Sequence, residues 1–438
     1  MILLKNATYI DWKTLNFHES DILVEEGPGG KIQFVSVSNT SPDGDVKENT
    51  SQVIDCKGML VTKSFANGHH HAYSALSRGM PSPAKSPADF TEILKYIWWT
   101  LDKCLDRDMI RASGLVTAIA SAKAGATFVI DHHASPFTVR GSLDILASAF
   151  EEVGVSHLLC YEISDRDGLE IAREGLEETQ DYLTRRQGLV GLHASFTLGD
   201  NTLEKAAELM DAFDSGIHIH VAEDTHDEIH CLKNHGKTVI ERLDEYGFLG
   251  SSKTILGHCL HLDGKERDIL RNSKAWVVQN TESNLNNKVG FFNSEGLGER
   301  IMLGTDGMHS DMLRSAKAAF YNGQFDTNMS FPLAYERFRK VHEYIRTNSF
   351  SGDGENNLVI LDYSSPTPVS KENFIGHFIF GLEAQDIKHV ISSGKLIVKD
   401  RIVQTVNEQE VMKNAREMAV QLWRCMHRSD HHPDNKKR

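Results

Sequence analysis

Short apolar segments alternate with amphipathic segments through the middle of the chain. The apolar segments predict eight buried strands, at residues 59–65, 127–131, 156–161, 188–192, 217–221, 254–256, 275–279 and 301–304. Apolar residues at helical spacing predict helices between most of them, as in LEKAAELMDAFD and GKTVIERLDEYG. Eight strand–helix units over about 300 residues predict an α/β fold, a (β/α)8 TIM-like barrel. A doubly wound open sheet is the alternative α/β arrangement.

Strand-like segments at both ends of the chain predict a second, smaller domain. The first part contains DILVEE, the turn GPGGK and IQFVSVS, and the last part contains NNLVILDY, IKHVISSGKLIVKD and RIVQTV. Because short strands need partners to bury a face, the two ends are expected to meet. We therefore predict a β-sandwich from residues 1–58 and 359–406 and a barrel from 59–358. A helix at 407–428 is predicted to pack on the barrel, and 429–438 to form a disordered tail.

Composition and charge limit the classes of partner and compartment. The 438 residues are 40% hydrophobic and carry a formal net charge of −14, which argues against nucleic acid as a partner. The six cysteines form no CxxC pair, which excludes a zinc ribbon and predicts reduced thiols in a cytoplasmic protein. The N-terminus lacks the apolar run of a signal peptide, and the most apolar helical stretch, at 115–130, is too short to cross a bilayer. No membrane partner is expected, and a homo-oligomer is compatible with the sequence.

The segment SFANGHHHAYSALSRG places three consecutive histidines at the end of the first predicted barrel strand. Successive side chains of a strand point to opposite faces, so His69 and His71 share one face and His70 points away. In a barrel, functional groups gather where the strands end. Later strands end in further groups that bind metals or transfer protons: His193, His220, Glu223, His258 and Asp306.

Each of these groups has a simpler interpretation when it is taken alone. A single histidine at a loop start is usually an ordinary polar residue, and GTDG alone is typical of a turn. His132 and His133 are a rival pair, but neighbours on a strand point to opposite faces, so at most one of them faces the site. His261 and His309 lie further from the strand ends. The prediction therefore rests on the joint occurrence of such groups at the same position of different strands.

Three histidines and one carboxylate are typical ligands of a divalent zinc or iron ion that keeps one position open for water. Such an ion lowers the pKa of water from ~16 to about 7. Glu223, on the turn after a strand, is suited to carry a proton, and His258 to steer the attacking water. Asp306 can bind the ion and accept a proton.

The same residues carry a resemblance to a known family. The N-x-H-x-H motif at residues 67–71, H-x-x-E at 220–223, GHC, SNLN and GTDG resemble the amidohydrolase superfamily, in its cytosine deaminase and chlorohydrolase (ATZ/TRZ-like) branch. More narrowly, YSALSRGMP, IWWTLDKCLDRD, VIDHHASP, GTDGMHSDM and DYSSPTP are similar to the SsnA-type aminohydrolases, a group tied by name to selenium metabolism. The chain departs from the family pattern in GDGENNLVI, where the family has G-x-x-A-D-L, and in a short stretch at 320–348. These departures concern the junction to the β-sandwich and the edge of the pocket.

The resemblance implies a metal-dependent hydrolase with a barrel and a β-sandwich made from both chain ends. It implies one catalytic ion, with Zn²⁺ favoured and Fe²⁺ as the alternative, bound by His69, His71, His220 and Asp306. Glu223 and His258 take the positions of the catalytic pair, with Asp306 as a third catalytic group, and His193 that of a substrate contact. Superfamily members with two metals use a carboxylated lysine at the end of the fourth strand. The corresponding segment here, GLVGLHASFTLGD, contains no lysine, which favours a single ion.

The implied reaction is hydrolytic deamination of a small aminated nitrogen heterocycle, in which water attacks the amino-bearing ring carbon and ammonia leaves. Trp98 and Trp99 follow the first strand, where their rings could stack on a flat base, although packing within a helix is the simpler role. Arg78 could contact a carbonyl or carboxylate of the substrate. Asn284, also a candidate for the substrate site, is expected to orient the neighbouring loop.

Other functions remain open at this point. The same site could open a cyclic amide, because a metal only requires an electrophilic carbon. The chain could also be a metal-containing protein that binds a metabolite without turnover, although Glu223 and His258 beside the ligands disfavour this. A serine hydrolase or a nucleotide-binding enzyme is poorly supported, because the sequence contains no G-x-S-x-G motif and no Walker loop.

Overall fold

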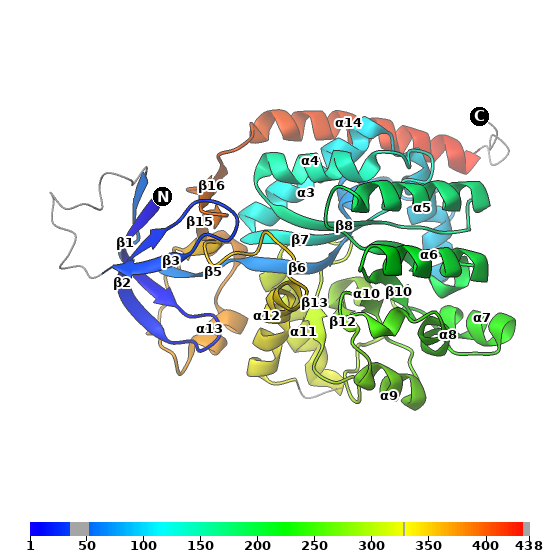
Figure 1. Ribbon diagram of the computed structural model, residues 1–438. Coiled ribbons are helices and arrows are strands. Elements are labelled where there is room, and N and C mark those ends of the chain that lie inside the picture. Colours follow the sequence, from blue (N-terminus) through cyan, green and yellow to red (C-terminus); the bar gives the residue numbers. More distant parts are fainter. Residues whose placement is uncertain (36–51, 327–328, 432–438) are drawn as a thin grey trace.

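The computed structural model describes residues 1–35, 52–326 and 329–431, which form a barrel and a smaller β-domain (Figure 1). The barrel strands are β6 (Phe65–His70), β7 (Ala126–His133), β8 (Ser156–Tyr161), β9 (Val190–Ala194), β10 (Ile217–Val221), β11 (Ile255–His258), β12 (Trp276–Gln279) and β13 (Ile301–Leu303). Strands β6 to β8 form one parallel sheet, and strands β9 to β13 form another.

Isolated parallel β-bridges join the edges of these two sheets on both sides. Leu159 and Ile163 bridge to Gly188 and Leu192, and on the other side His70 bridges to Asp306. The eight strands therefore follow one another around a closed circuit, which confirms the (β/α)8 fold and excludes the open sheet.

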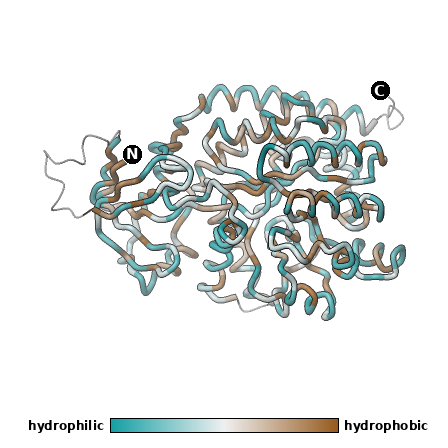
Figure 2. Tube along the Cα trace, viewed as in Figure 1, coloured by the Kyte–Doolittle hydropathy of each residue, from teal (hydrophilic) through white to brown (hydrophobic). Residues whose placement is uncertain are grey.

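Helices follow the strands and surround the barrel (Figure 1). The main ones are α3 (Arg107–Lys123), α4 (Ser142–Val153), α5 (Leu169–Leu183), α6 (Asp200–Ala212), α7 (Thr225–His235), α8 (Val239–Glu245), α9 (Gly264–Asn272), α10 (Thr281–Asn287), α11 (Met312–Asp326) and α12 (Phe331–Thr347). In Figure 2 the strands run through the centre with many hydrophobic positions, whereas the outer helices alternate hydrophobic and hydrophilic positions. This is the pattern that buries one face of each helix against the sheet.

Both ends of the chain form one nine-stranded sheet beside the barrel. Its strands are β1 (Ile2–Ile10), β2 (Phe17–Val24), β3 (Ile32–Val35), β4 (Gln52–Asp55), β5 (Leu60–Lys63), β14 (Leu358–Leu361), β15 (Ile387–Ser392), β16 (Lys395–Lys399) and β17 (Ile402–Val403). Strands β5 and β14 pair antiparallel and so join the two ends of the chain. Leu4, Val61 and Ile360 belong to a separate hydrophobic core of this domain. Both ends of the chain thus contribute strands to one small β-domain. Residues 36–38 of the predicted hairpin lie outside the described part of the chain.

The segment at residues 59–65, predicted as one barrel strand, contains residues of two strands that belong to different domains. Strand β5 pairs with β1 and β14 in the β-domain, and the chain enters the barrel only at β6, which begins at Phe65. An apolar segment has the same pattern in either sheet, so the sequence does not show where one domain ends.

The last helix, α14 (Glu408–His431), packs along α3 on the outside of the barrel (Figure 1). It includes residues 429–431 of the predicted tail, and residues 432–438 lie outside the described part. A disulfide joins Cys425 of α14 to Cys104, with a sequence separation of 321 residues. The prediction that all six cysteines are reduced is therefore wrong for this pair, because spacing in sequence says nothing about such distant partners. Cys56, Cys160, Cys231 and Cys259 are free and buried.

In the described ranges, every helix is too short or too polar to cross a lipid bilayer.

Candidate metal centre

The carboxyl ends of the barrel strands bring the predicted histidines and acids to one cavity. His71, His193, His220, Glu223 and Asp306 all line it. Two glycines allow the strands to approach here: a Cβ on Gly68 would lie 2.8 Å from the Leu303 carbonyl oxygen, and one on Gly304 would lie 2.8 Å from the His69 Cβ. The close packing of β6 against β13 thus places His69 near Asp306.

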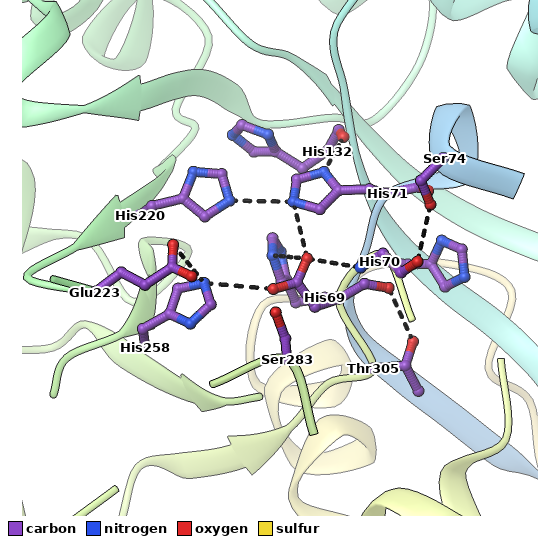
Figure 3. Close-up of polar contacts among 12 residues, drawn as sticks. His69, His70, His71, Ser74, His132, His220, Glu223, His258, Ser283 and Thr305 are labelled. Atoms are coloured by element: carbon purple, nitrogen blue, oxygen red, sulfur yellow. Dashed lines mark hydrogen bonds and ion pairs between the residues drawn. The ribbon is translucent and has the colours of Figure 1, made fainter. Parts of the chain in front are cut away.

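His71 Nε2 lies within contact distance of two other atoms of the predicted metal set, and Figure 3 shows its contact with His220. The Nε2 atoms of His71 and His220 are 3.2 Å apart, and His71 Nε2 is 3.3 Å from Asp306 Oδ1. His69 Nε2 is 4.0 Å from the same carboxylate oxygen. For a zinc–nitrogen distance of about 2.0–2.1 Å, tetrahedral neighbours lie ~3.3 Å apart, so the two contacts of His71 Nε2 have the spacing of neighbouring ligands of one ion. One ligand atom each of His69, His71 and His220 also lie within 4.8 Å of one another.

Hydrogen bonds at the other ring nitrogens show why a cation fits between these histidines. His71 Nδ1 donates to the His132 carbonyl at 2.7 Å, and His220 Nδ1 donates to the His193 carbonyl at 2.8 Å. Burial lowers the pKa of His71 and lowers that of His220 well below the usual value, so both rings are neutral at pH 7. Their Nε2 lone pairs therefore face each other with no proton between them. A divalent metal removes this repulsion.

His69 provides a second sign of the same kind. Its Nε2 is buried and has no hydrogen-bond partner among the described residues, whereas its Nδ1 lies 2.9 Å from His218 Nε2. A buried, unpaired ring nitrogen is costly unless it binds an ion. The donor set therefore fits a divalent metal ion.

Glu223 and His258 lie beside this ligand set. His258 Nε2 is 3.5 Å from Glu223 Oε2 and 3.6 Å from Asp306 Oδ2. Its Nδ1 donates to Asn284 Oδ1 at 2.7 Å, which fixes the direction of Nε2. Burial raises the pKa of Glu223 to about 7, so this side chain can hold or release a proton near neutral pH.

The backbone at two of these strand ends is in the left-handed region. His258 has φ +67° and Asp306 has φ +54°. Such conformations cost about 1–3 kcal/mol in a non-glycine residue and are concentrated at functional sites, where surrounding structure holds them. Asp306 lines the cavity, and His258 lies directly behind it with Nε2 3.6 Å from Asp306 Oδ2.

The predicted substrate residues have different placements. His193 lines the cavity, its Nδ1 2.8 Å from Thr197 Oγ1, and so do Trp98 and Trp99. The two tryptophans lie where a π-helical turn (Leu94–Trp98) meets the short helix α2 (Trp99–Leu101). Arg78 is exposed and lies outside the cavity lining, and Asn284 is buried behind His258.

The other histidines considered from the sequence have partners of their own. His70 points away from the ligands, as strand alternation predicts, with Nε2 3.1 Å from Ser310 Oγ and Nδ1 3.3 Å from Asp131 Oδ1. The remaining contacts are His133 with Ser135, His261 with the Val289 carbonyl, and His309 with Glu282.

Sequence reasoning missed His218 and Glu162 and left the role of His132 open. His218 contacts His69 Nδ1, and His132 lies 3.3 Å from Glu162, which itself lines the cavity. A signal existed for both missed residues. His218 is two residues before His220 on the same strand, and Glu162 directly follows β8, the third barrel strand.

Comparisons with known proteins identify the family of this chain. Residues 60–337 match the sequence model of the amidohydrolase family. The 5'-deoxyadenosine deaminase of Methanopyrus kandleri is 29% identical over 432 residues, covering 92% of this chain and 95% of that protein. The 5-methylthioadenosine/S-adenosylhomocysteine deaminase of Thermococcus sibiricus is 27% identical over 423 residues, covering 91% and 94%.

Solved structures share the fold at low sequence identity. An adenosine deaminase from Xanthomonas campestris with bound zinc has a TM-score of 0.82 at 16% identity, covering 96% of this chain and 98% of that chain. The atrazine chlorohydrolase TrzN from Arthrobacter aurescens, complexed with zinc, has a TM-score of 0.78 at 16% identity, covering 96% and 100%. Guanine deaminase of E. coli has a TM-score of 0.75 at 17% identity, covering 91% and 100%.

Proposed function

Because the chain belongs to the amidohydrolase family, a family of metal-dependent hydrolases, we propose that it removes the amino group of a small nitrogen heterocycle by hydrolysis. The chain is a hydrolase of carbon–nitrogen bonds other than peptide bonds. Two relatives that match it over nearly their whole length are named as deaminases of adenosine derivatives, which supports a heterocycle with an exocyclic amino group.

The proposed cofactor is one zinc ion held by His69, His71, His220 and Asp306. Nitrogen ligands and one carboxylate suit zinc, with Fe²⁺ as the alternative. A single ion is favoured because strand β9 and its end carry no lysine that could bridge two ions. When bound, the ion supplies positive charge that lowers the pKa of water to about 7 and so makes a nucleophile available.

Three side chains then carry the proton transfers. Asp306 accepts one proton from the attacking water, and Glu223 delivers a proton to the ring nitrogen next to the reacting carbon. Asn284 accepts from His258 Nδ1, so Nε2 faces the same point; in the imidazolium form of His258 this Nε2 donates a hydrogen bond and stabilises the charge that develops there. Asp306 passes the proton it accepted to the amino group, the carbon–nitrogen bond breaks, and ammonia leaves. The remaining hydroxyl proton returns to Glu223 while a carbonyl forms on the ring.

The cavity walls supply the substrate contacts. His193 is proposed to contact the heterocycle and Trp98 to cover its face, with Trp99 beside it. Asn284 is proposed to act through His258. A contact of Arg78 with the substrate also remains a proposal. The Arg78 side chain is exposed to solvent and does not line the cavity, so this contact requires its segment to move toward the cavity. A cytoplasmic location and a homo-oligomeric state also remain proposals.

The observation that carries this proposal is the 3.2 Å distance between His71 Nε2 and His220 Nε2, beside Glu223 and His258. A metal that only stabilised the fold would need neither Glu223 nor His258 beside it. This arrangement favours catalysis over binding without turnover.

The test is ammonia release from aminated purines, pyrimidines, pterins and triazines by zinc-replete protein. We expect at least one compound to release one ammonia per molecule converted, with a carbonyl in place of the amino group. Hydrolytic opening of a ring without release of ammonia would instead identify a cyclic amide hydrolase. Tight binding without turnover of any compound would identify a metabolite-binding protein.

A further inference from the structure

One wall of the cavity carries a buried carboxylate that the proposed reaction does not use. Glu162 directly follows β8, and its side chain is only 3% exposed. Its Oε2 is 3.3 Å from His132 Nδ1. A carboxylate oxygen of Glu162 and one ring nitrogen each of His193 and His220 all lie within 4.8 Å of one another. The carboxylate therefore stands beside the reacting position.

A buried arginine holds this carboxylate in place. Arg166 Nη1 donates to Glu162 Oε1 at 2.6 Å, and the same guanidinium pairs with Asp102 and lies 3.3 Å from Asp167. The Arg166 Cζ lies 5.3 Å from the Trp99 ring centroid, and Arg166 is absent from the described lining of the main cavity. Three carboxyl groups thus contact this guanidinium, so its positive charge is paired within the protein.

The cavity as a whole is acidic. Among the described residues that line it there are no lysines or arginines, but there are six carboxyl groups: Asp102, Glu162, Glu223, Asp224, Asp227 and Asp306. Burial raises the pKa of Asp102, Glu223 and Asp227 to about 7, so each of these three carries only part of a negative charge at neutral pH. One divalent cation offsets only part of this charge. A cavity lined by one sign of charge attracts the opposite sign and repels its own.

We propose that Glu162 is a specificity residue that accepts a hydrogen bond from an N–H or O–H group of the substrate, and that the cavity selects uncharged aminated bases or nucleosides over phosphate-bearing ones. This inference rests on the proposed function and names its substrate class. An ionised carboxylate only accepts hydrogen bonds, so a substrate edge that presents only acceptors is disfavoured beside it. A phosphate group adds two negative charges to a cavity whose described lining holds carboxyl groups and no lysine or arginine.

Matched nucleosides and nucleotides test the charge selection. Ammonia release by zinc-replete protein is measured with adenosine, cytidine and guanosine and with their 5′-monophosphates. For any base that reacts, kcat/KM is expected to be at least about a hundredfold higher for the nucleoside. A monophosphate that reacts as well as its nucleoside would overturn the inference and leave the proposed function intact.

Binding distinguishes failure of the inference from failure of the proposed function. The same six compounds are titrated calorimetrically into zinc-replete Glu223→Gln protein, which is expected to bind without turnover. Each base that binds should bind at least about tenfold more tightly as the nucleoside. If neither these six compounds nor the purines, pyrimidines, pterins and triazines release ammonia but this preference is seen, the proposed function fails and the inference stands. If no compound binds, or nucleotides bind as tightly, the inference fails.

The variant Glu162→Gln tests the residue itself. It keeps the shape but replaces an acceptor oxygen by an amide, so kcat/KM for the best uncharged substrate is expected to fall about 10- to 100-fold, mainly through KM. Zinc content should not change. Asp167→Asn is the matched control, because it also contacts Arg166 but does not line the main cavity. An equal loss in both variants, or a loss of zinc in Glu162→Gln, would reduce Glu162 to a structural role.

Discussion

Replacing His220 by asparagine is expected to remove the metal ion and to lower turnover more than about a thousandfold, because the activated water is lost with the ion. The shorter side chain cannot bring a donor to the point where His71 Nε2 and Asp306 Oδ1 converge. Zinc content by mass spectrometry and ammonia release on the best substrate of the panel measure both effects.

The control for this variant is His70→Asn, which changes a buried histidine next to two ligands. His70 contacts Ser310 and Asp131 and points away from the proposed ion, so zinc content should stay near that of the unchanged protein. If His220→Asn keeps its zinc, or if His70→Asn loses zinc to the same extent, the ligand assignment is wrong.

Replacing Glu223 by glutamine should lower turnover about 100- to 10,000-fold while zinc content stays the same, because a neutral amide of the same size cannot transfer a proton. The variant keeps the neighbouring side chains of His258 and Asp306, so the loss is specific to Glu223. Steady-state ammonia release, zinc analysis and circular dichroism on the same preparation separate loss of chemistry from loss of metal or fold.

Asp224→Asn is the matched control for Glu223→Gln, since it removes the same charge one residue away. Asp224 caps helix α7 by accepting from the His226 amide at 2.9 Å, and asparagine is an equally good cap. Its effect on turnover should stay below about tenfold. Comparable losses in the two variants would mean that charge in the cavity, rather than proton transfer by Glu223, supports the reaction.

The ligands could be predicted from the sequence because strand geometry is local. Alternation along β6 places His69 and His71 on one face and His70 on the other, whatever the rest of the chain does. The barrel then brings the ends of distant strands to one edge, which places His220 and Asp306 near them. These two rules needed no knowledge of side-chain packing.

Other features depend on packing that leaves no local pattern. Strands β5 (LVTK) and β6 (FANGHH) follow one another in one buried segment of the chain. Only their partner strands show that they belong to different domains. Cys104 and Cys425 are brought together by the docking of α14, which no spacing rule describes. Glu162 could have been noticed at a strand end, but its bond to Arg166, and the contact of Arg166 with Trp99, depend on how the loops after β8 and β6 pack together.

The most direct test of the metal centre is anomalous diffraction at the zinc edge from crystals of zinc-replete protein. The geometry predicts one strong peak per chain, about 2.0–2.2 Å from His69 Nε2, His71 Nε2, His220 Nε2 and a carboxylate oxygen of Asp306. A peak held by other residues, or two peaks in this cavity, would contradict a single catalytic ion bound by these four side chains.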